Sequence, residues 1–169
     1  YGATVSPSVT INRGDFIDKK DIIETLGLPL FVKPTCNGSS VGVSKVNNEE
    51  DFDKAIEIAF AAGDQIMCEK FVKGRELACS VMEYKGKMMV LPLTEVVSKN
   101  EFFDYEAKYN GHSREVCPAQ IPDTLRDEIQ EVSKKIYSHL GCAGLVRVDY
   151  ISSEDGLYFL EVNTIPGMT

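Results

Sequence analysis

The residues best suited to chemistry lie in the stretch GLVRVDYISSEDGLYFLEVNTIPGMT, residues 144–169. Its pattern predicts two strands joined by a tight turn, with Asp149 opposite Glu161 and Arg147 opposite Asn163 on one face. Two facing carboxylates repel each other, whereas a divalent cation between them makes the pair favourable. Carboxylate oxygens and the amide oxygen of Asn163 suit Mg²⁺ together with substrate phosphates. We therefore favour a metal–phosphate site over the alternative, a solvated outer face of an amphipathic hairpin.

The turn between these strands sets their register. Residues 154–156, Glu-Asp-Gly, suit a three-residue hairpin loop in which Gly156 takes the left-handed conformation. Such a loop places Ser153 opposite Leu157, and the two pairs above follow by counting back. Alternation assigns five apolar side chains to the other face: Val146, Val148, Tyr158, Leu160 and Val162. The segment at 163–167 is expected to be a tight turn whose backbone can approach a ligand closely.

The composition suits one domain or two small lobes that share a cleft, because 43% of the 169 residues are apolar. The net charge of −8 argues against sequence-independent binding to nucleic acid, which requires a basic surface. No apolar run is long enough to span a membrane, and no signal peptide is recognised. The chain starts without Met and ends abruptly, so we expect it to be part of a longer protein.

The cysteines do not have the pattern of a zinc site or a disulfide framework. There are five of them, none in a CxxC pair, and only two histidines are available as further ligands. We expect reduced, cytosolic thiols that serve as small core residues. The residues are Cys36, Cys68, Cys79, Cys117 and Cys142.

Apolar periodicity and stop signals predict three helices, each followed by a glycine: 18–26, 48–62 and 124–140. The expected caps are Asn47 or Asn48 for the second helix and Asp123 for the third. The expected buried stripes are Phe52, Ala55, Ile56, Ala59 and Phe60 in the second helix and Leu125, Ile129, Val132, Ile136 and Leu140 in the third. The expected strands are an edge strand or lead-in at 5–11, a buried strand at 28–32, a strand at 65–72 and a hairpin of 77–84 with 88–97.

A loop of small residues, TCNGSSVGV at 35–43, follows the strand that runs into Lys33. Gly38 and Gly42 permit backbone N–H groups to converge on an anion, and Lys33 supplies a cation of the kind that phosphates need. The loop matches neither the GxxxxGK[ST] nor the GxGxxG pattern, so it implies neither mechanism. A flexible hairpin tip is an equally supported interpretation.

Two further segments are candidates for ligand binding. Glu69, Lys70 and Glu76 lie where one lobe would pass into the next, and a hinge between lobes is a common place for a cleft. Scattered surface charge is the alternative interpretation of these three residues. The segment 98–113 lacks periodicity but contains aromatic residues and Lys108, which is typical of a lid or a binding loop.

Taken together, these segments resemble the ATP-grasp ligases, and among them the D-alanine–D-alanine ligase family. The resemblance rests on five segments in order: FVKPTCNGSSVGVSKV, EKFVKGRE, FFDYEAKY, GLVRVDY and FLEVNTIPGMT. It implies an α+β, ATP-grasp fold in which two α+β lobes with antiparallel sheets enclose a nucleotide cleft. The implied division is a lead-in from a missing N-terminal lobe at 1–28, a central lobe with the glycine/serine flap at 29–72, and a C-terminal lobe, truncated at its end, at 73–169.

The resemblance also implies roles for individual residues. The implied catalytic residues are Arg147, Gly167, Ser39 and Tyr109, with Arg147 and the Gly167 backbone stabilising an acyl phosphate and an oxyanion. The implied nucleotide-binding residues are Lys33 and Ser40 at the phosphates, Glu69, Lys70 and Val72 at the adenine, Glu76 at the ribose, and Lys108 in the closing loop. The implied ligands of Mg²⁺, or Mn²⁺, are Asp149, Glu161 and Asn163.

The function implied is a cytoplasmic ligase that uses ATP and Mg²⁺ to join two D-alanines through an acyl phosphate, for peptidoglycan synthesis. A homodimer is implied for the full-length protein, with no nucleic-acid or membrane partner. Residues 106–109, Glu-Ala-Lys-Tyr, resemble those of dipeptide-forming members rather than members that make D-alanyl-D-lactate. The alternatives are another ATP-grasp ligase that joins a carboxylate to an amine, and a non-catalytic nucleotide-binding module. Because the N-terminal lobe is absent, we expect this chain alone to bind Mg-ATP weakly and to form little dipeptide.

Overall fold

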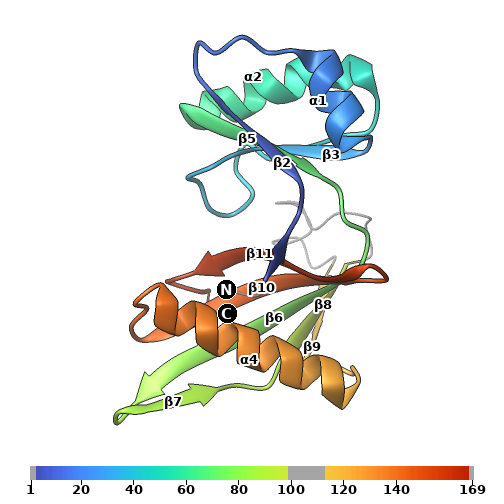
Figure 1. Cartoon of the computed structure of the whole chain (residues 1–169). Coiled ribbons are helices and arrows are strands. Elements are labelled where there is room, and N and C mark those ends of the chain that lie inside the picture. Colours follow the sequence, from blue (N-terminus) through green and yellow to red (C-terminus); the bar gives the residue numbers. More distant parts are fainter. Residues whose placement is uncertain (1–2, 99–112, 168–169) are drawn as a thin grey trace. The chain divides into compact units, whose positions relative to one another are not determined.

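The computed structural model describes residues 3–98 and 113–167, and these form two compact units (Figure 1). We call Ser6–Val72 the loop unit. We call the described residues 3–5, 73–98 and 113–167 the hairpin unit. Each unit has its own sheet and its own apolar core.

The loop unit is an antiparallel sheet with two helices on one face (Figure 1). Its strands, in their order across the sheet, are β2 (Ser8–Asn12), β5 (Gln65–Lys70), β3 (Leu30–Pro34) and β4 (Ser44–Val46). Its helices are α1 (Lys19–Leu26) and α2 (Phe52–Ala62), with a short 3₁₀ turn, η1 (Glu49–Asp51), directly before α2. In β3, Leu30 and Val32 are fully buried against the helices, so alternation turns Phe31 and Lys33 to the other face.

The ends of the loop-unit helices follow from local hydrogen bonds. The Asp18 carboxylate accepts a hydrogen bond from the N–H of Asp21 at 3.1 Å and so caps α1. At the end of α2, the Arg13 guanidinium donates to the carbonyls of Phe60 and Gly63, which the helix leaves without a partner. Asn48 precedes η1 but makes no capping hydrogen bond through its side chain, contrary to one of the two expected caps.

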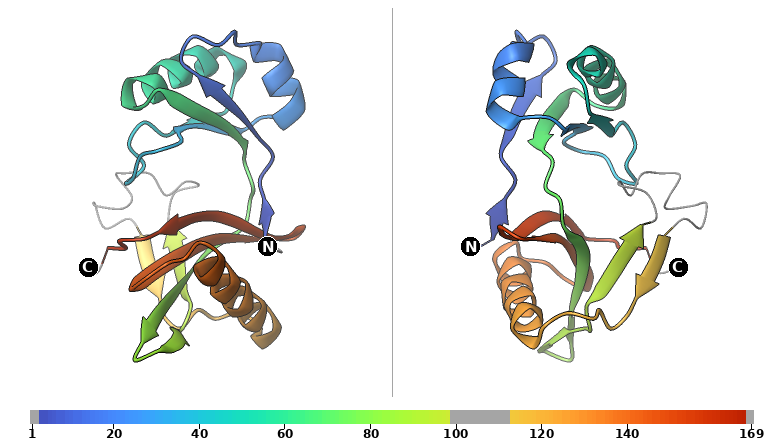
Figure 2. Two further views of the ribbon diagram at one scale, coloured as in Figure 1. Left: turned by 60° about the vertical axis from the view of Figure 1, so that its left-hand side comes forward. Right: turned by 90° about the vertical axis from the view of Figure 1, so that its right-hand side faces the viewer.

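The hairpin unit contains a larger sheet and one helix, and Figure 2 shows its long paired strands β10 and β11 from two further sides. The strands in order across the sheet are β1 (Thr4–Val5), β11 (Gly156–Asn163), β10 (Leu145–Ser153), β6 (Arg75–Tyr84), β8 (Thr94–Ser98) and β9 (Ser113–Val116), with β7 (Lys87–Val90) also paired to β6. Only the β1–β11 pair is parallel among the described pairs. The helix α4 (Asp123–His139) packs on this sheet through Ile129, Val132 and Ile136, three of the residues expected to be buried.

Several expectations for these elements were wrong. The strand expected at 88–97 is divided into β7 and β8, because Pro92 lacks the N–H that a continuous ladder needs. Pro122 precedes α4, so Asp123 is the first residue of the helix rather than its cap. Leu140 lies beyond the helix and is 60% exposed, whereas Ser133 and Tyr137 are buried in its place.

The described residues from 3 to 28 are divided between the two units. Residues 3–5 belong to the hairpin unit, and the chain from Ser6 onward supplies β2 and α1 to the loop unit. The core role expected for the cysteines holds for Cys68 and Cys79, whereas Cys36 and Cys117 are exposed. Within the described ranges, no helix combines the length and the apolar character that a membrane span requires.

Candidate active site

The register of β10 and β11 differs from the predicted one near the turn and agrees with it at the site. The turn is one residue shorter than expected, since Ser153 pairs with Gly156 and Leu157 lies opposite Ser152. The register shifts between Asp149 and Tyr150, which indicates a bulge on β11 at Leu160. The bulge compensates for the shorter turn, so beyond it Asp149 does face Glu161 and Arg147 does face Asn163.

The same bulge changes which apolar residues of β11 reach the core. Leu157 and Phe159 pack against the core together with Val162, so the assignment of Tyr158 and Leu160 to that face was wrong. Bulges redirect side chains and are frequent beside active sites. Here the bulge lets the turn-proximal part of β11 bury its apolar residues while Glu161 remains opposite Asp149.

Four side chains form a connected polar cluster on this hairpin. Arg147 donates from Nε to Asp149 Oδ1 at 2.8 Å and from Nη2 to Oδ2 at 2.9 Å. The Asn163 amide donates to Asp149 Oδ2 at 2.9 Å and to Glu161 Oε1 at 3.3 Å. The Asp149 side chain is only 8% exposed, so its hydrogen-bond partners must compensate for the hydration that the carboxylate has lost.

The charge of Arg147 is fixed by its surroundings. The hydrogen bond to Asp149 raises the pKa of the guanidinium, and the carboxylates of Asp149, Glu161 and Glu115 act in the same direction against the cost of burial. Arg147 is therefore a permanent cation beside two carboxylates. A permanent cation of this kind can stabilise negative charge on a phosphate or an oxyanion.

The donor atoms of this cluster fit a hard divalent cation. Asp149 and Glu161 offer carboxylate oxygens from neighbouring strands, and Asn163 has an amide oxygen within the same group. Across the described ranges, no group of three or more His, Cys, Asp and Glu side chains gathers to hold a metal by itself. The set therefore suits Mg²⁺ or Mn²⁺, which bind through one or two carboxylates and complete their coordination with water and substrate phosphates. The Asn163 amide must turn its oxygen inward to take part.

The loop unit brings a second pair of predicted residues together. Lys33 Nζ lies 2.6 Å from Glu69 Oε2, with the two side chains 25% and 12% exposed. Both side chains lie on the sheet face away from the helices, because Phe31 pairs with Glu69 across β3 and β5. Lys70 is exposed, and its backbone N–H donates to the carbonyl of Pro7.

An aromatic group that was not predicted from the sequence lies near this pair. The Phe31 and Phe71 rings meet edge to face with centroids 5.8 Å apart, and Lys45 Nζ lies 4.5 Å from the centroid of Phe71. Such a group offers flat apolar surface and positive charge to a heteroaromatic ring. The alternation of LPLFVKP already placed Phe31 on the face of Lys33, and this signal could have been used.

The 35–43 loop is anchored rather than a free hairpin tip. Asn37 Nδ2 donates to the carbonyl of Ala62 at 2.7 Å, which ties the loop to the end of α2. Gly42 has φ +78°, and a Cβ there would lie 2.7 Å from the Cβ of Ala62. Ser39 and Ser40 also have positive φ, 54° and 56°, a conformation that non-glycine residues adopt rarely and that is often associated with function. Gly38, in contrast, does not have a positive φ.

The remaining predicted residues are less informative. Glu76 lies on β6 in the hairpin unit, opposite Ile151, and Val72 is half-buried at the end of the loop unit. Gly167 is exposed beyond β11. Lys108 and Tyr109 lie outside the described residues, so their assignments stay predictions.

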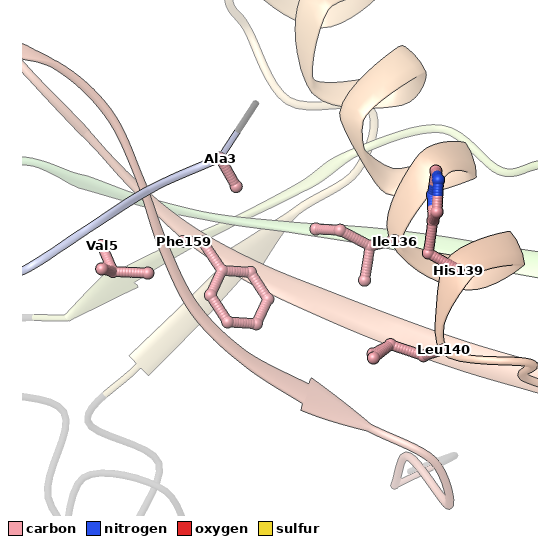
Figure 3. A pocket seen from close by; sticks show the side chains of 6 residues that line it. All are labelled: Ala3, Val5, Ile136, His139, Leu140 and Phe159. Carbon is pink, nitrogen blue, oxygen red and sulfur yellow. The ribbon is translucent and has the colours of Figure 1, made fainter. Parts of the chain in front are cut away.

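An apolar pocket in the hairpin unit is separate from this cluster. Figure 3 shows Phe159 of β11 and Ile136 and His139 of α4 around it, with Val5 and Leu140 also in its lining. Its lining contains no carboxylate and only one ionisable residue, His139. The pocket therefore lacks the groups that would hold a metal or a phosphate.

Comparisons with known proteins identify the family of this chain. The profile of the family described as D-ala D-ala ligase C-terminus matches residues 1–169. The D-alanine–D-alanine ligase of Phocaeicola vulgatus is 46% identical over an alignment of 170 positions that covers all of this chain and 52% of that protein. That of Flavobacterium johnsoniae is 45% identical over 169 residues, again all of this chain and 52% of that protein.

Solved structures show the same relationship. The VanG D-Ala:D-Ser ligase from Enterococcus faecalis superposes with a TM-score of 0.85 at 38% identity, covering 99% of this chain and 50% of that one. The D-alanyl-alanine synthetase A from Vibrio cholerae has a TM-score of 0.85 at 33% identity and covers 99% and 52%. This chain therefore has the α+β fold of the ATP-grasp ligases and spans about half the length of the curated relatives it matches. The chain belongs to the D-alanine–D-alanine ligase C-terminal family.

Proposed function

We propose that this chain is the nucleotide- and metal-binding part of an ADP-forming ligase that joins two D-alanines for peptidoglycan synthesis. The observation that carries the proposal is the cluster of Arg147, Asp149, Glu161 and Asn163 on one hairpin face. It occurs in a chain that is 46% identical over its whole length to a D-alanine–D-alanine ligase. We further propose that the full-length protein is a cytoplasmic homodimer that needs neither nucleic acid nor a membrane.

In the first step, the carboxylate of one D-alanine attacks the γ-phosphate of ATP and yields an acyl phosphate and ADP. Catalysis of such a step depends on positioning and on cations rather than on a protein nucleophile. Asp149, Glu161 and Asn163 would hold Mg²⁺ or Mn²⁺. When bound, this cation would neutralise negative charge on the phosphate oxygens. Arg147, as a permanent cation, and Lys33 supply the protein's own positive charge.

In the second step, the amine of another D-alanine attacks the acyl carbonyl, and phosphate leaves from a tetrahedral intermediate. Arg147 and the Gly167 backbone N–H would stabilise the oxyanion. Ser39, Ser40, Lys108 and Tyr109 would cover the acyl phosphate and exclude water.

Nucleotide contacts are proposed for four residues. Glu69, Lys70 and Val72 are proposed to contact the adenine, and Glu76 the ribose. The edge-to-face pair of Phe31 and Phe71 supports this assignment for the loop unit, because it adds aromatic surface beside Glu69.

The test is ADP release by the full-length protein that contains this chain, supplied with Mg-ATP and one candidate substrate at a time. We expect release with D-alanine and none with L-alanine or D-lactate, and we expect chelation of Mg²⁺ to abolish it. Release that depends on another carboxylate and amine would instead assign a different ligase of the same fold. No release with any amino acid would indicate a non-catalytic nucleotide-binding module.

A second candidate is a ligase that joins D-alanine to D-serine. It is favoured by one observation, the TM-score of 0.85 at 38% identity to a protein described as a D-Ala:D-Ser ligase. Mixed incubations with D-alanine and D-serine separate the two, because the dipeptide formed identifies the acceptor. A dominant D-alanyl-D-serine product would support this candidate over the first.

A further inference from the structure

A small polar cluster lies in the apolar core behind the candidate metal ligands. The Tyr150 hydroxyl and Ser133 Oγ are 2.7 Å apart, and both residues are fully buried. Cys79 on the neighbouring strand β6 is fully buried as well. Across the described residues, no buried side-chain nitrogen or oxygen lacks a partner, so these groups satisfy one another.

The position of this cluster connects α4 to the two strands that carry the site. Tyr150 follows Asp149 directly and lies at the register shift of β10 and β11. Cys79 pairs with Val148 on β10, and the preceding residue, Ala78, pairs with Asp149. The Ser133 hydroxyl thus links the middle of α4 to β10 at the residue that follows Asp149.

The bulge makes such a link useful. A β-bulge interrupts the ladder and permits local variation in twist, so the strand needs other contacts to fix its position there. The Tyr150 ring packs edge to face on Phe159, with centroids 6.3 Å apart, but an apolar contact of this kind allows sliding. A buried hydrogen bond to a helix is directional, and a satisfied polar pair in a core favours one arrangement over others.

We propose that the Tyr150–Ser133 hydrogen bond is a positioning contact that holds β10 at the bulge and thereby keeps Asp149 at the separation from Glu161 that a divalent cation requires. The inference rests on the proposed function, because it assigns both carboxylates to the metal. Tyr150 and Ser133 touch neither metal nor substrate in this assignment and act only through the backbone of Asp149.

The test uses Tyr150→Phe and Ser133→Ala, each of which removes one hydroxyl of the pair, in the full-length protein that contains this chain. The readout is Mn²⁺ binding in the presence of ADP, measured from the electron paramagnetic resonance signal of free Mn²⁺. We expect the Mn²⁺ dissociation constant to rise about tenfold in both variants, the lower end of the effect of outer partners of metal ligands. The apparent KM for Mg²⁺ in ADP release should rise in parallel, with little change in kcat at saturating Mg²⁺.

Tyr137→Phe is the matched control. Tyr137 lies on the same helix, is 2% exposed, and donates its hydroxyl to the carbonyl of Gly144 at 2.9 Å, away from the bulge. We expect its loss to lower thermal stability as much as Tyr150→Phe does but to leave Mn²⁺ binding unchanged. Equal weakening of Mn²⁺ binding by Tyr137→Phe would overturn the proposal.

The double variant of Tyr150→Phe with Ser133→Ala separates positioning from stability. Because both hydroxyls are then absent, no buried hydroxyl is left without a partner. We therefore expect the double variant to regain most of the stability that each single variant loses. Mn²⁺ binding should stay weak, since the link between α4 and β10 is still absent. Recovery of Mn²⁺ affinity together with stability would overturn the proposal, as would unchanged affinity in both single variants. Failure of the parent protein to bind Mn²⁺ would instead overturn the proposed function and, with it, this inference.

Discussion

The two groups of candidate site residues lie on different kinds of structure. In the hairpin unit, the polar cluster around Asp149 projects from two paired strands, and its hydrogen bonds stay within that pair. In the loop unit, Lys33 is held by Glu69, while Ser39 and Ser40 lie in a loop whose shape depends on contacts with the end of α2. The comparison indicates that Glu161 can be changed with little effect on folding, whereas the loop-unit contacts serve binding and stability together.

The largest effect is expected for Glu161→Gln. Glu161 is exposed and accepts one hydrogen bond of 3.3 Å from Asn163, so its neutralisation removes a metal charge and relieves repulsion with Asp149. We expect ADP release to fall at least about 100-fold, the scale of losing one charge-stabilising group. The melting temperature should change by no more than about 2 °C. Glu154→Gln in the exposed turn is the control, and normal turnover of Glu161→Gln would show that the metal assignment is wrong.

Lys33→Met tests whether one residue of the loop unit contributes to both ADP release and stability. The substitution removes a proposed phosphate contact and also leaves the Glu69 side chain, which is 12% exposed, without its ionic partner. We expect ADP release to fall about 100-fold and the free energy of unfolding to fall by about 1–3 kcal/mol, the cost of a buried group that loses its partner.

The double variant of Lys33→Met with Glu69→Gln separates the two effects. Since the unpaired carboxylate is gone, urea denaturation should show that stability returns most of the way to that of the parent. ADP release should remain low. A Lys33→Met protein as stable as the parent would contradict the view that this pair contributes to the fold.

Gly42→Ala should give a smaller effect on the same unit. An alanine at φ +78° is strained, and its Cβ would meet the Cβ of Ala62 at 2.7 Å. We expect a loss of about 1–2 kcal/mol in urea denaturation and weaker ATP binding. Gly38→Ala is the control, because nothing lies within 4 Å of a Cβ there and its φ is not positive. Equal losses from both substitutions would show that the anchoring at Gly42 does not shape the loop.

The sequence was a good guide to the hairpin because its site depends on local alternation. The site lies on two strands that are close in the chain. Alternation of side chains along each strand is therefore enough to place Arg147, Asp149, Glu161 and Asn163 on one face. The bulge at the register shift was not predictable, since a shorter turn with a bulge and a longer turn without one give the same pairs at Asp149. The pairing of Ser153 with Gly156 and the packing of Leu157 and Phe159 distinguish the two arrangements.

The loop unit was harder to predict because its contacts join distant segments. The pairing of Lys33 with Glu69 depends on the order of β3 and β5 in the sheet, which no local pattern states. The anchoring of the 35–43 loop requires that Asn37 and Gly42 meet Ala62 at the end of α2. Likewise, the division of the strand at Pro92 became evident only from the sheet. There, β7 and β8 pair with different parts of β6.

The smallest expected effect concerns a structural ion pair of the hairpin unit. Arg75 donates to Glu95 at 2.7 and 2.6 Å and to the carbonyl of Gln120 at 2.8 Å. The hydrogen bonds from Arg75 lower the pKa of Glu95 below its ordinary value of 4.5. A carboxyl group whose pKa is lower in the folded state stabilises the protein above the unfolded pKa, and this contribution is lost as pH falls through the folded pKa.

Glu95→Gln should therefore be less stable than the parent at pH 7, and the difference should shrink as the pH falls below 4.5. The measurement is the urea midpoint of both proteins from pH 7 to about pH 3. ADP release at pH 7 should stay within about threefold of the parent, because Glu95 is not among the proposed site residues. Glu95→Gln would then lower stability and leave ADP release nearly unchanged, the reverse of Glu161→Gln on the same sheet. A stability difference that does not vary with pH would show that Glu95 acts through packing, and a large loss of turnover would show that chemistry and stability are coupled in the hairpin unit as in the loop unit.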